Sequence, residues 1–299
     1  MKKFLKKIRH LLEYYIFLVM IKVIGLFGID RAATLCANIA RRVGPLLRVN
    51  LIAKRNLQNV FGQDKDYTNI ISKLWENFGR FIGEFPYIND MSEEEVAERV
   101  KFEGVENLAE FQKMKQPFLL FTGHFANWDI ALRRIDTLYP KFGVVYRKSN
   151  NPYIDKIINK TRSNRNINLI PKGPYGAKSL IKSIKSGHAI AMLVDQKMND
   201  GIEVPFFGRP AMTSHAIAKF AIQFNYPIIP CQIIRTFGSN FKVIIHPALQ
   251  LKQTDNIEQD CYNIMLQINK LLESWIIEYP EQWLWFHNRW KKEILKQPF

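Results

Sequence analysis

From about residue 101 onward, short apolar runs alternate with segments of helical periodicity, and this alternation constrains the fold more than any other feature. The intervening segments repeat apolar residues every three to four positions, as amphipathic helices do. Such alternation predicts a mixed α/β sheet flanked by helices. The expected strands cover residues 117–122, 142–146, 189–194, 227–234 and 241–246, and the expected helices cover 126–138, 151–164, 174–186, 213–225 and 256–277.

Residues 31–100 have a different texture and predict helices. Trp75, Phe78 and Ile82 recur at three- and four-residue spacing and mark one apolar helical face. Because no linker rich in Gly, Pro or Ser follows, 299 residues fit a helical N-terminal part joined to a single α/β catalytic domain over 101–299.

Positive charge is concentrated at the N-terminus. The first 60 residues carry 12 basic and two acidic side chains, which supplies +10 of the net charge of +16 and predicts an anionic partner. An apolar stretch over 11–29 follows five early cations, but Glu13 and Lys22 would each cost free energy inside hydrocarbon. We therefore expect residues 1–30 to associate with a membrane surface, either spanning it or lying in the interface. The alternative is a core helix with a solvated basic tail.

Several chemical classes are disfavoured by absent motifs. Cys36, Cys231 and Cys261 are far apart and form no C-x-x-C pair, which disfavours a disulfide framework or a thiolate zinc site and favours a reducing compartment. The sequence contains no G-x-S-x-G elbow, no G-x-G-x-x-G and no H-E-x-x-H. We therefore expect no metal and no cofactor, and the sequence offers no obvious nucleophile for a covalent intermediate.

The most informative segment lies where the first strand of the α/β region ends at Gly123. His124 and Asp129 follow, five residues apart, a spacing that would separate them by about 140° on a regular helix. They can meet only if His124 lies in the loop and Asp129 in the first helical turn. The carboxylate would then orient the imidazole as a general base for a hydroxyl. A loop histidine beside an acid that the helix dipole favours would give the same spacing.

Residues 122–129 (T-G-H-F-A-N-W-D) resemble the first block of the lysophospholipid acyltransferase superfamily, and specifically its lipid A biosynthesis late acyltransferases. Together with the later blocks, the resemblance covers about residues 115–290 and the basic, hydrophobic N-terminus. The sequence departs from the family at Lys148, where proline is common, and at 159–161, which is less basic. Five further blocks follow in the family's order: Val145-Tyr146-Arg147 with Asn150-Asn151-Pro152, Arg162-Ser163-Asn164, Val194-Asp195-Gln196, Pro205-Phe206-Phe207-Gly208, and residues 281–290 (E-Q-W-L-W-F-H-N-R-W).

This resemblance implies transfer of a fatty acyl chain from an acyl-carrier-protein thioester to a hydroxyl of a lipid A precursor of the Kdo-lipid IVA type. The reaction would belong to lipopolysaccharide biosynthesis and take place at the cytoplasmic face of the inner membrane. His124 would be the general base and Asp129 its partner. Negative charge on the thioester oxygen needs donors, and the candidates are Arg162, then Lys160 or Arg147, and backbone N–H groups near Gly123.

The remaining blocks have two interpretations each. Asp195 and Gln196 are expected at the substrate, although Asp195 could merely cap a turn. Phe206, Phe207 and Gly208 could rim an acyl or lipid slot or pack in the core. The tryptophans of the last block, Trp283, Trp285 and Trp290, could form an interfacial belt or belong to the core.

Three other functions compete with this prediction. A glycerol-phosphate type acyltransferase is disfavoured by the Glu-Gln-Trp-x-Trp sequence that begins at Glu281. A non-catalytic, basic peripheral membrane protein would share the charge pattern. Nucleic-acid binding is disfavoured because the basic residues cluster around an apolar stretch rather than among exposed aromatic side chains.

Overall fold

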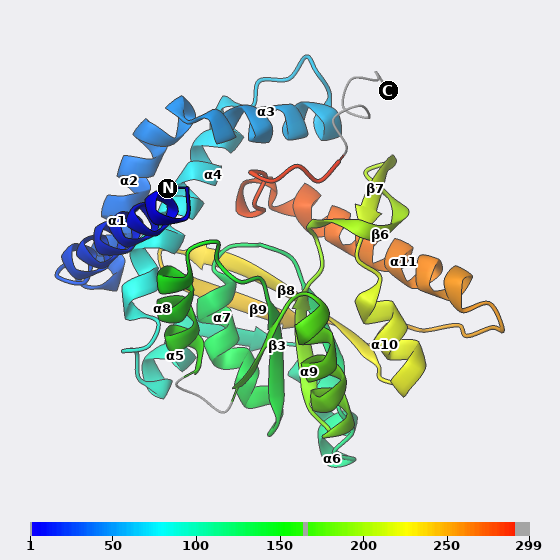
Figure 1. Cartoon of the computed structure of the whole chain (residues 1–299). Coiled ribbons are helices and arrows are strands. Elements are labelled where there is room, and N and C mark those ends of the chain that lie inside the picture. Colours follow the sequence, from blue (N-terminus) through cyan, green and yellow to red (C-terminus); the bar gives the residue numbers. More distant parts are fainter. Residues whose placement is uncertain (1, 164–166, 291–299) are drawn as a thin grey trace.

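The computed structural model describes residues 2–163 and 167–290, so Asn164 and the end of the expected catalytic domain, 291–299, lie outside the described residues. Within that part, a seven-stranded sheet occupies the centre, in the order β1-β9-β8-β2-β5-β3-β4 (Figure 1). In this sheet only the described strands β8 and β9 pair antiparallel, so the predicted mixed α/β sheet is confirmed. Its strands are β1 (Val100–Glu103), β2 (Leu119–Thr122), β3 (Phe142–Tyr146), β4 (Ile167–Pro171), β5 (Ala189–Leu193), β8 (Ile228–Phe237) and β9 (Asn240–Ile245).

Two apolar layers cover the sheet because side chains alternate along each strand. Leu119 and Phe121 of β2 face one cluster, which also holds side chains from α9, α10 and α11. Phe118 and Leu120 face the other, which holds side chains from α5 and α7. The helices of this region are α5 (Glu93–Arg99), α6 (Ala109–Lys113), α7 (Trp128–Ile135), α8 (Pro152–Ser163), α9 (Pro174–Lys185), α10 (Ala216–Phe224) and α11 (Ile257–Glu278).

Sequence patterning located the central strands and missed the peripheral ones. The five expected strands are β2, β3, β5, β8 and β9, each within a few residues of its expected bounds. The missed strands β1 and β4 are the two edges of the sheet, where less apolar sequence suffices. Also missed was a separate hairpin of β6 (Lys197–Phe206) and β7 (Arg209–Thr213), whose outer half is partly exposed.

The helical N-terminal part lies above one end of the sheet (Figure 1). Its helices α2 and α4 approach closely because small residues face each other. A Cβ on Gly83 would lie 2.6 Å from the carbonyl oxygen of Ala32, and one on Gly79 would lie 2.5 Å from that of Cys36. No helix of the described chain combines the length and apolarity needed to cross a membrane. The helices are α1 (Lys2–Ile24), α2 (Ile29–Val43), α3 (Arg48–Phe61) and α4 (Thr68–Glu84).

The segment after α11 turns back against the loop that joins β2 to α7. Phe125 and Trp283 form an isolated antiparallel bridge there. Trp283, Trp285 and Trp290 are at most 1% exposed, so of their two interpretations the core is confirmed and the interfacial belt is excluded. Short 3-10 helices complete the chain: η1 (Gly44–Leu46), η2 (Phe85–Tyr87), η3 (Val105–Leu108), η4 (Asp136–Leu138) and η5 (Pro280–Gln282).

Candidate active site

His124 and Asp195 meet at the carboxyl ends of two neighbouring strands. β2 and β5 are parallel, and Thr122 pairs with Leu193 in their register. His124 and Asp195 each lie two residues beyond that pair, so the register places them level with each other. His124 Nδ1 lies 2.7 Å from Asp195 Oδ1. The carboxyl edge of an open α/β sheet is the usual place for a ligand site.

Asp195 is completely buried and accepts three hydrogen bonds. Besides the imidazole, its Oδ2 accepts the His124 backbone N–H over 2.8 Å and the Trp283 indole N–H over 2.7 Å. Burial alone would raise the pKa of Asp195, but the neighbouring His124 and these hydrogen bonds outweigh it and hold that pKa well below its usual value. The carboxylate is therefore ionised and can only accept. His124 Nδ1 must carry the proton in this bond, which leaves Nε2 as the basic nitrogen.

Asp129 does not orient His124, which corrects the sequence prediction. His124 lies in the loop and Asp129 in the first turn of α7, as expected, but the Asp129 carboxylate accepts two hydrogen bonds from Arg162 of α8, each 2.9 Å long. Burial alone would lower the pKa of Arg162, and the Asp129 charge more than compensates. The spacing placed both residues correctly, but the register of β5 supplied a nearer carboxylate.

A cavity of about 520 Å³ opens beside this pair, and both polar and apolar side chains line it. The polar ones include His124, Arg147, Arg162, Lys172 and Gln196. The apolar ones come from β4, β5, α9 and α10 and include Ile170, Leu180, Met192, Ile217 and Phe220. The His124 side chain is 15% exposed, so a ligand in the cavity can reach it.

Four of the predicted site residues line this cavity: His124, Arg147, Arg162 and Gln196. The Gln196 amide nitrogen lies 3.3 Å from His124 Nε2. Lys160, an expected alternative donor, is exposed on α8 and is not part of the lining.

Of the two interpretations of Phe206, Phe207 and Gly208, the structure supports core packing for Phe206 rather than the rim of an acyl slot. These residues form the end of β6 and the turn into β7, and none of the three lines the cavity. Phe206 is fully buried against Trp283 and Trp290. Because the hairpin packs on the C-terminal segment, its aromatic side chains fill the core.

Backbone N–H groups after Gly123 are also engaged within the fold, contrary to the expectation of an oxyanion site there. Those of His124, Phe125 and Ala126 donate to Asp195, to the Gly123 carbonyl and to the Gln282 carbonyl respectively.

Two residues of the site were missed by sequence reasoning. Trp283 donates to Asp195, and its only sequence signal was its place in the last block. Lys172 follows β4 directly, as Arg147 follows β3, and the register pairs Tyr146 with Pro171. Burial and the charge of Arg147 both lower the pKa of Lys172, and a bound anion would relieve this repulsion.

No cysteine lines the described part of the cavity, and burial raises the pKa of Cys36, Cys231 and Cys261, which favours their unreactive thiol form. Among the residues that the structure describes, no cluster of three or more His, Cys, Asp or Glu is arranged to hold a metal ion.

Comparison with known proteins identifies related sequences. The family model described as "Bacterial lipid A biosynthesis acyltransferase" matches residues 1–292. The chain is 24% identical to a lipid A biosynthesis lauroyltransferase of Escherichia coli K12, over 80% of this chain and 78% of the relative. It is 23% identical to the palmitoleoyltransferase of the same organism, over 84% and 83%. A 1-acyl-sn-glycerophosphate acyltransferase structure from Thermotoga maritima, PlsC, aligns with a TM-score of 0.39 and 14% identity, over 82% of this chain and 99% of that one.

Proposed function

This chain belongs to the bacterial lipid A biosynthesis acyltransferase family, and we propose that it transfers a fatty acyl chain from an acyl-carrier-protein thioester to a hydroxyl of a Kdo-lipid IVA type precursor. The observation that carries the proposal is the His124–Asp195 pair at the wall of a cavity lined by both cationic and apolar side chains. A thioester with a long acyl chain needs both kinds of contact.

His124 is the general base of the proposed reaction. Its Nε2 takes the proton of the acceptor hydroxyl while that oxygen attacks the thioester carbonyl carbon. The carbon–sulfur bond then breaks, and the leaving thiolate takes the proton back from the imidazolium. Asp195 holds the imidazole in the required tautomer and stabilises its protonated form. This direct transfer suits a cavity whose described lining includes no cysteine.

Arg162 is the proposed donor to the thioester oxygen. It lines the cavity, and Asp129 fixes its guanidinium by a two-bond contact. A preorganised cation at this place can stabilise the negative charge that develops as the hydroxyl attacks. Asp129 therefore acts through Arg162, and Asp195 takes the orienting role at His124.

Arg147 and Lys172 make the cavity suitable for phosphate groups. Asp200 is the acid among the described lining residues, and Arg162 is already paired with Asp129. The acceptor class carries phosphates and sugar acids, and carrier proteins are acidic, so both substrates complement these cationic side chains.

The decisive assay incubates the purified protein with a panel of acyl-carrier-protein thioesters and a tetra-acylated lipid A precursor, and reads the products by mass. We expect the acceptor to gain one acyl chain. Acylation of a lysophospholipid or glycerol phosphate instead would support the glycerol-phosphate type, and no transfer to either acceptor would support the non-catalytic alternative.

We propose that the apolar wall between α9 and α10 receives the acyl chain, and Phe220 is a half-buried part of it. Phe220→Trp should shorten the slot and lower kcat/KM for the longest accepted chain about tenfold or more relative to shorter ones, since one methylene in an apolar pocket can decide that much. Rates with donors of different length measure the effect. Phe224→Trp is the matched control, because Phe224 lies one turn further along α10 and does not line the cavity. Equal preferences in both variants would exclude this slot.

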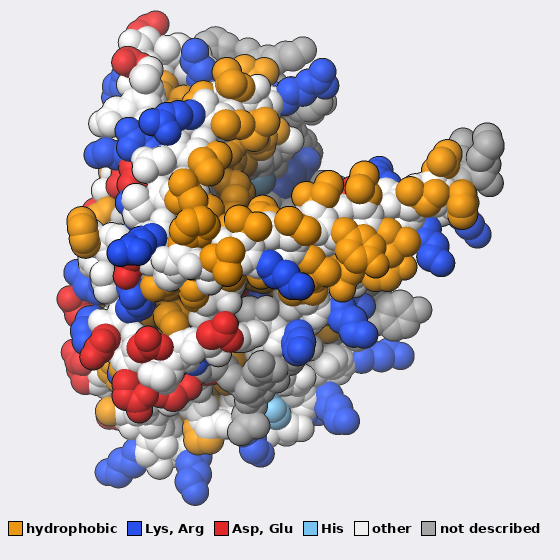
Figure 2. Space-filling model, turned by 90° about the vertical axis from the view of Figure 1, so that its left-hand side faces the viewer, with side chains coloured by type: hydrophobic (Ala, Val, Ile, Leu, Met, Phe, Trp, Pro, Cys, Tyr) orange, Lys and Arg blue, Asp and Glu red, His pale blue; other side chains and the backbone are white. Residues whose placement is uncertain are grey.

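We further propose that the N-terminal helices rest on the cytoplasmic face of the inner membrane. Large apolar side chains are exposed along α1, α2, η1 and α3, and Figure 2 shows them as a continuous band bordered by Lys and Arg. Leu26 and Leu46 are more than 80% exposed. Such a surface fits an interface with anionic headgroups.

Leu26→Asp with Leu46→Asp should therefore weaken binding to anionic vesicles by at least about tenfold, since each leucine contributes about 1.5–3 kcal/mol when buried. Cosedimentation at two salt concentrations measures binding. Met114→Asp, an equally polar change at the exposed end of α6, is the control and should bind as the parent does. Unchanged binding of the double variant would contradict the assignment.

A further inference from the structure

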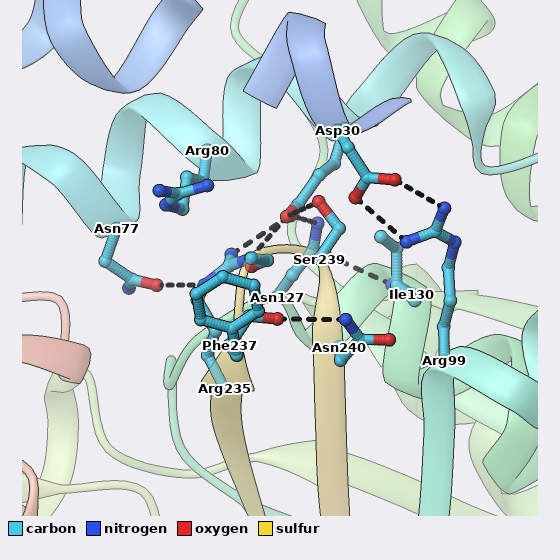
Figure 3. A network of polar contacts seen from close by, with 12 residues as sticks. Asp30, Asn77, Arg80, Arg99, Asn127, Ile130, Arg235, Phe237, Ser239 and Asn240 are labelled. Carbon is cyan, nitrogen blue, oxygen red and sulfur yellow. Dashed lines mark hydrogen bonds and ion pairs between the residues drawn. The ribbon is translucent and has the colours of Figure 1, made fainter. Parts of the chain in front are cut away.

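A buried polar cluster contacts the loop that precedes α7. Glu84, the last residue of α4, is fully buried, and its carboxylate forms an ion pair with Arg235 of β8. Ser239, in the turn between β8 and β9, donates to Glu84 over 2.8 Å, and the Asn127 amide donates over 2.7 Å. In Figure 3, Asn127, Arg235 and Ser239 point toward the same place between α4, the β8–β9 hairpin and α7. The cluster thus joins the N-terminal helices to the catalytic sheet.

Asn127 connects this cluster to the start of α7. Its Oδ1 accepts the backbone N–H groups of Asp129 and Ile130, each over 3.1 Å, and so caps the helix. Because the oxygen is committed to the cap, the amide nitrogen is a buried donor that needs an acceptor. Glu84 is that acceptor, and it fixes the orientation of the Asn127 amide.

The backbone just before Asn127 is held from a second side. Ala126 has φ 48°, a left-handed conformation that is unfavourable for a residue with a Cβ. Its N–H donates to the Gln282 carbonyl over 3.0 Å, and the Gln282 side chain makes two hydrogen bonds with the main chain of Arg235. Arg235 binds Glu84, so a closed circuit of contacts returns to Asn127.

We infer that Glu84 and Asn127 are positioning residues, which hold the turn of the His124 loop so that the imidazole stays level with Asp195 and the cavity. His124 lies three residues before Asn127, and its carbonyl accepts the N–H of Leu284, two residues after Gln282. A displacement of about 1 Å at a catalytic group can cost about 10²-fold in rate. This role rests on the proposed function, because it matters for turnover only if His124 is the base.

The first test is Asn127→Ser, which keeps a capping oxygen and removes the contact with Glu84. We expect kcat to fall about ten- to a hundredfold with both KM values unchanged. Asn256→Ser is the matched control, since Asn256 caps α11 through its side chain and is remote from the cavity lining. Because Asn256 is exposed and serine caps a helix about as well as asparagine, this control should keep the parental kcat and nearly the parental thermal stability. A parental kcat in Asn127→Ser, or an equal loss in Asn256→Ser, would overturn the inference.

A second test reverses the polarity of the contact. Asn127→Asp alone sets two buried carboxylates against each other. Glu84→Gln alone replaces one carboxylate oxygen by an N–H donor, which must face either the Asn127 amide or Arg235, both of them donors. When both substitutions are combined, the new amide at position 84 can donate to the new carboxylate at position 127, which still caps the helix and leaves one negative charge near Arg235. We expect the double variant to exceed both single variants in kcat by about tenfold, as coupled neighbours do. A double variant no better than the worse single one would contradict the role of this contact.

Failure of the inference and failure of the proposed function are distinguishable. If His124→Ala abolishes transfer while Asn127→Ser does not, only the positioning role fails. If the parent protein transfers no acyl group, the position of the imidazole is still measurable as the downfield proton resonance of the His124 Nδ1–H bond to Asp195. That resonance should broaden or shift in Asn127→Ser and persist in Asn256→Ser; its persistence in both would overturn the positioning role.

Discussion

His124→Ala is expected to lower kcat for acyl transfer about 10³-fold or more, within the range that a general base contributes. The variant loses the only histidine on the described cavity lining, so the acceptor hydroxyl has no imidazole to take its proton. Because the variant leaves the buried Asp195 carboxylate without its imidazole partner, the melting temperature should also fall, and rates are compared at a temperature where both proteins are folded. Single-turnover rates with an acyl-carrier-protein donor and a lipid A precursor measure the effect.

His188→Ala is the control for this change. His188 precedes β5, and its Nδ1 lies 3.1 Å from the Ser183 carbonyl oxygen, away from the cavity lining. It should retain the parental kcat. Full activity of His124→Ala would remove the general base from the proposed mechanism, whatever the family membership of the chain.

Asp195→Asn is expected to lower kcat about 10²–10⁴-fold, as in other sites where a buried carboxylate fixes a catalytic imidazole. The amide can present a donor to Nδ1 and thereby favour the tautomer that carries its proton on Nε2, which cannot accept the hydroxyl proton. Asp129→Asn serves as the comparison. Asp129 contacts Arg162 rather than His124. Asp129→Asn should therefore lower kcat by weakening the stabilisation of negative charge on the thioester oxygen. If Asp129→Asn changes the pH dependence of kcat that reports His124 protonation more than Asp195→Asn does, the two assignments are reversed.

The stability of Asp195→Asn should depend on pH with a definite sign. The folded-state pKa of Asp195 lies below its unfolded value of about 3.9, so ionised Asp195 stabilises the fold above that value. This contribution is lost as the pH falls from there toward the folded-state pKa. The difference in free energy of unfolding between the parent and the variant should thus be largest at neutral pH and shrink below about pH 4. Denaturant titrations across this range measure it.

The outcome at His124 shows how far local spacing reaches. The sequence placed His124 in a loop and Asp129 in the first turn of α7, and both placements hold. It could not choose between Asp129 and Asp195 as the partner, because that choice depends on the pairing of β2 with β5 across 71 residues. Helix periodicity carries no information about that register.

The aromatic blocks show a different limit. The sequence singled out Phe206 and Trp283 as members of aromatic blocks. An aromatic run is equally compatible with the rim of an acyl slot, an interfacial belt and the hydrophobic core. The structure buries both rings against each other because the β6–β7 hairpin packs on the C-terminal segment. The apolar lining of the cavity instead comes partly from α9 and α10, whose sequences have the periodicity of ordinary amphipathic helices.

By itself the sequence determined the alternation of strands and helices, the order of the motif blocks and the concentration of positive charge at one end. These features are local, because periodicity, turn residues and side-chain charge act over a few neighbours. Only the tertiary structure decided that Asp195 and Trp283 surround the imidazole loop, that Asp129 holds Arg162, and that Glu84 reaches Asn127 across 43 residues. Each of those contacts joins segments that are distant along the chain, and strand register and helix packing bring them together.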